Sequence, residues 1–185
     1  MTGQTLAFPE VLANVPTAEL VNVYEAGPAR IRQSLVGLGS VQLRAHPRTG
    51  KWSIAQVLLH LTDSEIMGAG RIRLALAQPG APVTGYDQDI WANELRYHRR
   101  DHAAIATALH LFSALRDATT SLFREASRSD WDKTVSHHEW GPLTLRQLLE
   151  LYADHSERHI EQILHMRQLL GTPTEMPMLL TTRLY

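Results

Sequence analysis

The chain has 185 residues, a formal net charge of −1 and no cysteine. This length suits one domain that buries its core without disulfides, so we expect a single domain over residues 1–185. Balanced charge without basic runs argues against a nucleic-acid partner. The lack of cysteine excludes disulfides, iron–sulfur clusters and a thiol nucleophile of the chain's own, so any thiol chemistry needs a thiol from outside.

The sequence shows no targeting or membrane signal. The first residues lack the basic region and apolar core of a secretory signal. No uncharged apolar stretch approaches the roughly 20 residues that span a bilayer. We therefore expect a cytoplasmic protein that has no membrane partner.

The N-terminal part begins with a lead-in over residues 1–16, which contains two prolines and little periodicity. A helix is then predicted to begin with Thr17 as its N-cap and to run to about residue 38. Gly27 and Pro28 interrupt its pattern, and because a proline inside a helix removes a hydrogen bond, we expect a kink or a restart there.

The second long helix has a sharply defined start. Ser53 and Gln56 form a capping box, in which each side chain bonds the backbone N–H of the other residue. The helix should run to about residue 77, where a proline and a glycine stop it, and it carries His60 two turns in. A Pro/Gly loop over residues 79–86 follows.

Two more helices follow this loop. Residues 87–95 read as a short helix, and Asp101 caps a long one that ends near residue 126. Residues 129–140 form a compact connection, and strand-like alternation of useful length is found nowhere.

The last long helix repeats the signature of the second. Thr144 and Gln147 form another capping box, and the helix should end at Gly171. The tail over residues 172–185 is too apolar for a solvated end, so it should pack on the bundle or on a second subunit, and we expect a homodimer.

Helices of matched length, each with one apolar face, predict an all-α four-helix bundle. We expect an up-down-up-down order with a long connection between the second and third long helices. That order makes the second and fourth helices parallel.

Three histidines are candidate ligands of a metal ion. His155 and His159 lie four residues apart on the apolar face of the last helix, where they are either hydrogen-bonded core residues or ligands. His60 lies at a similar depth from its own capping box, so parallel helices would bring the three rings to one level. Three neutral imidazoles suit Zn(II), Ni(II), Fe(II) or Mn(II) and leave positions for water or substrate.

Three segments carry a resemblance to a known family. Residues 52–65 (WSIAQVLLHLTDSE), 86–91 (YDQDIW) and 155–160 (HSERHI) resemble signature stretches of the DinB-like superfamily, and in particular its YfiT-type branch. The resemblance covers about residues 17–171, with the three segments in the family's order and spacing.

This resemblance implies a DinB/YfiT-like bundle whose metal site, with zinc or nickel, falls on His60, His155 and His159. It also implies an enzyme that activates a low-molecular-weight thiol or water against a small electrophilic substrate, as a thiol-dependent S-transferase or a hydrolase. The alternatives are a stress-response protein that binds metal or small molecules without turnover, and a purely structural dimeric bundle.

Four residues in the connecting loops are candidates for acid–base roles or for orienting the groups of the site. They are Tyr86, Asp87, His137 and His138, which should border the mouth of the bundle. Ordinary loop hydrogen bonds or helix capping are the alternative for each. The shape of the substrate pocket depends on these loops.

Overall fold

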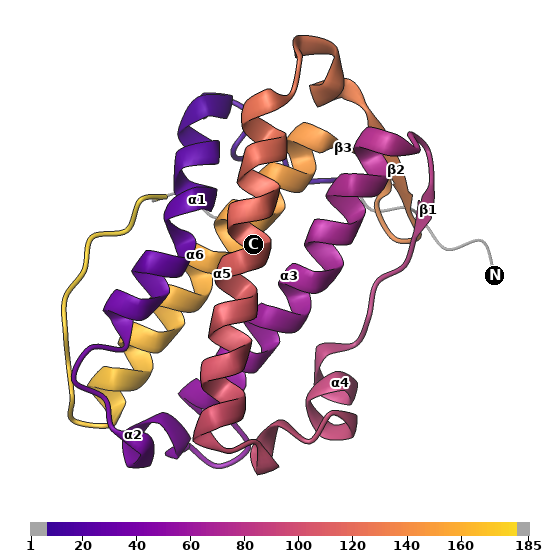
Figure 1. Cartoon of the computed structure of the whole chain (residues 1–185). Coiled ribbons are helices and arrows are strands. Elements are labelled where there is room, and N and C mark those ends of the chain that lie inside the picture. The colour runs from indigo at the N-terminus through magenta and orange to yellow at the C-terminus, as the bar shows by residue number, and fades with distance from the viewer. Residues whose placement is uncertain (1–6, 181–185) are drawn as a thin grey trace.

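The structure, a computed structural model, describes residues 7–180. Its four long helices stand side by side as a bundle, and a small sheet lies against one end (Figure 1). The predicted all-α four-helix bundle is therefore confirmed. Among residues 7–180, no helix combines the length and apolar character needed to cross a bilayer.

The elements in chain order are α1 Thr17–Ser34, α2 Ser40–Arg44, α3 Ile54–Ala77, β1 Pro82–Val83, α4 Gln88–Glu94, the 3-10 helix η1 Tyr97–Arg99, α5 His102–Glu125, the 3-10 helix η2 Arg128–Asp132, β2 Thr134–His137, β3 Gly141–Thr144 and α6 Leu145–Leu169.

The long helices begin where the capping signals predicted, with one exception. The hydroxyl oxygens of Ser53 and Thr144 accept from the backbone N–H three residues on, and the glutamine of each capping box bonds back. Asp101 caps α5 in the predicted manner. For α1 the prediction was wrong: the N-cap is Pro16, no side chain caps the helix, and Thr17 is its first residue.

The directions of the helices differ from the predicted up-down-up-down order, because α3 and α5 run parallel. The Thr62 hydroxyl of α3 donates to the carbonyl of Ala108 at 3.0 Å. Three turns farther along α3, Arg73 contacts Thr119 at 3.2 Å, so positions rise together on both helices. The long connection over residues 78–101 causes this, because it leads the chain back to the end of the bundle where α3 began (Figure 1).

As a result, α6 runs antiparallel to α3, although the sequence argument placed them parallel. His60, near the start of α3, lies beside His155 and His159 of α6. Farther along α3, Gly68 faces Tyr152, which comes earlier in α6. The three histidines still meet because His60 is near the beginning of α3 while the other two lie near the middle of α6.

A small three-stranded sheet was not predicted. β1 pairs in parallel with β2 and β2 pairs antiparallel with β3. Its strands have two to four residues, which is too short for an alternating pattern to stand out in the sequence. The sheet ties the start of the long connection to the segment just before α6.

Arg116 of α5 lies fully buried at the centre of the bundle and contacts the other three long helices. Its guanidinium pairs with the Glu65 carboxylate of α3 at 2.6 Å, and both side chains are at most 1% exposed. It also donates to the carbonyl oxygens of Tyr24 of α1 and Tyr152 of α6, at 3.0 and 2.8 Å. The Tyr24 hydroxyl donates to the other oxygen of Glu65. One cation therefore joins all four long helices.

The Gly27-Pro28 step of α1 makes room for this cation. Of the predicted kink or restart, the restart does not occur, since α1 is one helix from Thr17 to Ser34. Pro28 has no N–H to bond the Tyr24 carbonyl one turn back, so that oxygen is available to Arg116. A Cβ at Gly27 would lie 3.3 Å from the guanidinium, so glycine leaves the guanidinium its space.

The tail packs on the bundle as far as the structure describes it. Met176 and Leu180 are buried. Arg30 of α1 pairs with Glu157 of α6 at 2.6 Å and also donates to the Pro177 carbonyl. The backbone N–H of Leu179 donates to the same Glu157 carboxylate at 2.7 Å. The end of the predicted tail, residues 181–185, lies outside the described residues.

Close packing of α3 on α6 predicts opposite effects for two glycines of one helix. A Cβ at Gly68 would lie 2.5 Å from a ring carbon of Tyr152, whereas nothing lies within 4 Å of one at Gly70. We expect Gly68→Ala to lower the free energy of unfolding by about 1–3 kcal/mol, because the overpacked ring must move. Gly70→Ala should raise it by up to about 1 kcal/mol through helix propensity. Urea denaturation measures both, and equal stabilities would contradict this packing.

Candidate metal centre

His60, His155 and His159 come together between α3 and α6, and the three form a group that could hold a metal ion. The Nε2 atom of His155 lies 3.2 Å from that of His60 and 3.1 Å from that of His159. One ligand atom from each residue falls within 4.8 Å of the others. The imidazoles thus converge through the same ring nitrogen.

This convergence fits a cation better than a chain of hydrogen bonds. A neutral imidazole has one N–H donor and one acceptor nitrogen, so the His155 Nε2 cannot bond well to two neighbours at once. Zn–N distances of about 2.0–2.1 Å would place two nitrogens about 3.3 Å apart at a tetrahedral angle and about 2.9 Å apart at a right angle. The observed contacts of 3.1 and 3.2 Å lie between these values.

The surroundings of two rings orient them toward the common point. The Nδ1 of His159 lies 2.7 Å from the Gln162 side-chain oxygen, so it donates its proton there and leaves Nε2 free to accept. The indole of Trp52 packs on His60 with ring centroids 5.2 Å apart. His60 is buried, and its Nδ1 has no hydrogen-bond partner among the described residues. Packing rather than a hydrogen bond therefore orients His60.

All three rings are held neutral at physiological pH. Burial, followed by His159 and Arg158, lowers the pKa of His60 to about 3. Burial lowers the pKa of His159 to about 4, although the bond to Gln162 opposes the shift. Burial and the other two histidines hold the pKa of His155 well below its ordinary value. Neutral rings keep the lone pairs that a metal ion needs.

Two cavities open beside this group. Their volumes are about 430 and 480 Å³, and His159 borders both, together with Gln88, Gln162 and His165. The larger also borders His155. A small molecule can therefore reach the imidazole group from the open side between α4 and α6.

The long connection covers the adjacent part of the site and is tied down at three points. Arg71 of α3 donates to the Thr84 carbonyl and, at 2.9 Å, to the Tyr152 hydroxyl. The Gly85 N–H donates to the Nδ1 of His138 at 3.0 Å. Tyr86 is hydrogen-bonded to Ser64, and its burial raises the pKa of its hydroxyl.

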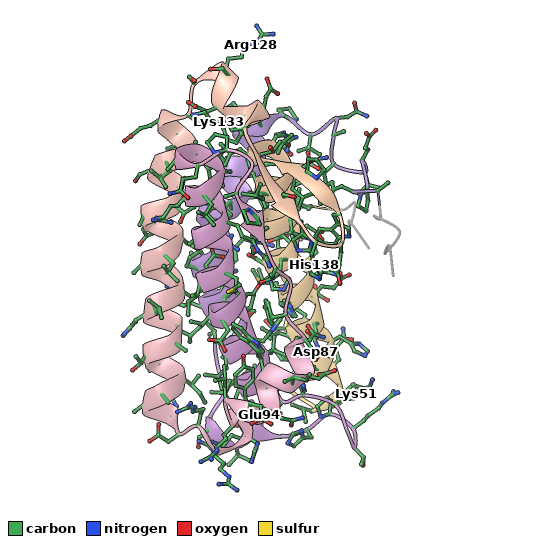
Figure 2. All side chains as sticks on the ribbon, turned by 90° about the vertical axis from the view of Figure 1, so that its right-hand side faces the viewer. Lys51, Asp87, Glu94, Arg128, Lys133 and His138 are labelled. Atoms are coloured by element: carbon green, nitrogen blue, oxygen red, sulfur yellow. The ribbon has the colours of Figure 1, made fainter. Side chains whose placement is uncertain are left out.

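The four loop candidates lie on this face at different places. Tyr86 bonds Ser64, which is one helical turn beyond His60 on α3, and its ring packs on Trp91. Asp87 caps α4 by accepting from two backbone N–H groups, which matches the capping alternative. His138 and Asp87 follow one another down this face (Figure 2).

His137 is a buried part of the hairpin of β2 and β3. Its Nδ1 accepts from the Glu139 N–H at 3.2 Å, and its ring stacks on Trp140. Neither His137 nor His138 borders the two cavities beside His159. Acid–base roles for the four loop candidates stay predictions.

The sequence reasoning missed three residues that border both cavities. They are Gln88, Gln162 and His165. A signal was present for two of them, because Gln162 and His165 continue the turn-by-turn spacing of the His155 and His159 face of α6. Gln88, at the start of α4, had no comparable signal.

Comparisons with known proteins agree with this fold and with a metal site. A family model described as the DinB superfamily matches residues 23–163. The "Putative metal-dependent hydrolase YfiT" of Bacillus subtilis is 27% identical over 179 residues, which cover 92% of this chain and 99% of the relative. A relative of the same description from Bacillus licheniformis is 31% identical over 149 residues, covering 78% of this chain and 81% of its own.

Solved structures show the same fold. That of YfiT, described as a probable metal-dependent hydrolase with an unusual four-helix bundle topology, matches with a TM-score of 0.78 and 25% identity over 90% of this chain and 94% of its own. The structure of a mycothiol-dependent maleylpyruvate isomerase matches with a TM-score of 0.65, and the match covers 86% of this chain and 63% of the isomerase chain. The two sequences are 12% identical, so this likeness concerns the fold alone. The match of the family model over most of the chain shows that this protein belongs to the DinB superfamily.

Proposed function

We propose that His60, His155 and His159 bind one divalent metal ion, Zn(II) or Ni(II), and that the protein is a metal-dependent enzyme. The proposed reaction is the attack of a thiol or a water molecule on a small electrophile, as in a thiol-dependent S-transferase or a hydrolase. The convergence of the three Nε2 atoms beside two open cavities carries this proposal.

The donor set supports a catalytic rather than a structural site. Three neutral imidazoles are ligands that Zn(II) and Ni(II) accept well, and three protein ligands leave at least one position open. When bound, the ion supplies Lewis acidity, which lowers the pKa of a water or thiol beside it. The chain's own residues fix the donors: Gln162 sets the tautomer of His159, and Trp52 holds the His60 ring.

The remaining polar groups of the site suit the binding and orientation of a substrate. Gln88 and Gln162 present amides at both cavities, and Arg158 places a cation at the larger one. Tyr86 keeps its proton at neutral pH because its pKa is raised, so it can donate a hydrogen bond. The names of the relatives support metal dependence. The thiol cosubstrate is proposed by analogy with the mycothiol-dependent protein that shares this fold.

A paired assay tests the reaction. We expect the zinc- or nickel-loaded protein to consume mycothiol or another small thiol in the presence of monobromobimane, or to hydrolyse p-nitrophenyl acetate without a thiol. His60→Ala should lower either rate at least 100-fold, because it removes a donor to the ion, while His110→Ala on the exposed face of α5 should not change it. Bound metal without turnover across such a panel would favour the binding protein over the enzyme.

A further inference from the structure

The cavity of about 430 Å³ carries two positive charges that the fold itself does not neutralise. Arg48 and Lys51, in the loop before α3, both line it and are exposed. Among residues 7–180, no hydrogen bond or ion pair engages either side chain, whereas Arg30, Arg116 and Arg158 are all paired with carboxylates. Asp89 is the single acidic residue in the described lining, so the cavity has an excess of positive charge.

The same cavity has an apolar wall and ends at the histidine group. Trp52, Met166 and Leu169 line it, and His159 also borders it. Trp52 also packs on His60, so the apolar wall continues to the proposed metal ligands. Figure 2 shows Lys51 at the end of the bundle near α4, below Asp87 on the face that carries the site.

We infer that this cavity binds the substrate of the proposed metal site through an anionic group, which Arg48 and Lys51 hold, while an apolar body lies on Trp52, Met166 and Leu169. The anionic group is a carboxylate or a phosphate. Arg48 and Lys51 would hold the anionic end of such a molecule in a cavity that His159 also borders. The inference rests on the proposed function only for the statement that the bound molecule is the substrate.

Binding of three probes of one shape tests the charge preference. We expect 2-naphthoate and 2-naphthyl phosphate to bind the wild-type protein at least fivefold more tightly than neutral 2-naphthamide, measured by calorimetry at low ionic strength. Each of Arg48→Gln and Lys51→Met should weaken anion binding about two- to fivefold, as for other exposed charge pairs. Binding of 2-naphthamide should stay within twofold in both variants.

Arg128→Gln is the matched control, because Arg128 is also exposed but lies at the opposite end of the bundle (Figure 2). It should leave all three affinities unchanged. Equal affinities for the charged and neutral probes would overturn the inference. So would anion binding that survives in the metal-loaded Arg48→Gln/Lys51→Met double variant but is lost in His155→Ala in the same metal-containing buffer, because the ion itself would then hold the anion.

The same titrations on metal-free protein separate this inference from the proposed function. If the histidines bind no metal, the preference for anions is still expected, because Arg48 and Lys51 do not depend on the ion. If metal binds and turnover occurs but the probes show no charge preference, only the anion site is excluded.

Discussion

Replacing Arg116 with methionine should lower the free energy of unfolding by about 3–5 kcal/mol, which is the usual effect of removing one partner of a buried ion pair. The reason is that Glu65, whose side chain is 1% exposed, would lose the cation that compensates its burial. The carbonyl oxygens of Tyr24 and Tyr152 would also lose their donor. Urea denaturation followed by circular dichroism measures the change.

Arg124→Met is the matched control for this experiment. Arg124 is on the same helix and pairs with Glu25, but both side chains are about half exposed, at 49% and 48%. The loss there should be below about 1 kcal/mol, because water screens the pair. A loss for Arg116→Met no larger than for Arg124→Met would contradict a central role of the buried pair. Adding Glu65→Gln to Arg116→Met should recover part of the stability, since it removes the unpaired charge.

The second large effect concerns the metal ion. Wild-type protein is expected to bind one zinc or nickel ion per chain, and His155→Ala should bind almost none at micromolar metal, because His155 contacts both other ligands. Binding stabilises the native state by about 2.7 kcal/mol when free metal is 100 times the dissociation constant. A chelator should therefore lower the Tm of the wild type and leave that of His155→Ala unchanged. Elemental analysis and thermal denaturation provide the two readouts.

His110→Ala serves as the control here too, because it removes an exposed imidazole of α5 that is remote from the cluster. It should keep both the metal and the response to chelator. Two results would contradict the metal site: stoichiometric metal in His155→Ala, or wild-type protein whose Tm no chelator changes. The second result would favour a structural bundle with histidines in its core.

The sequence by itself determined the local structure and the candidate ligands. Ser53, Asp101 and Thr144 located the beginnings of three long helices, because a cap depends on residues within one turn of chain. The spacing of His155 and His159 placed them on one face of a helix for the same reason. The third histidine came from its depth on another helix together with the family resemblance.

Only the tertiary structure decided the helix directions, the buried contacts of Arg116 and the lining of the cavities, because these depend on contacts between distant segments. The long connection reverses the expected direction of α5, and as a result α6 runs antiparallel to α3. The prediction that the histidines lie at equal depth on parallel helices was therefore wrong, although the three histidines do meet. Pro28, read as a helix interruption, frees a carbonyl for a cation from another helix. Arg48 and Lys51 showed no local pattern, because a cavity wall is assembled from several elements. Capping and periodicity are short-range, whereas helix direction, buried pairing and cavities arise from long-range packing.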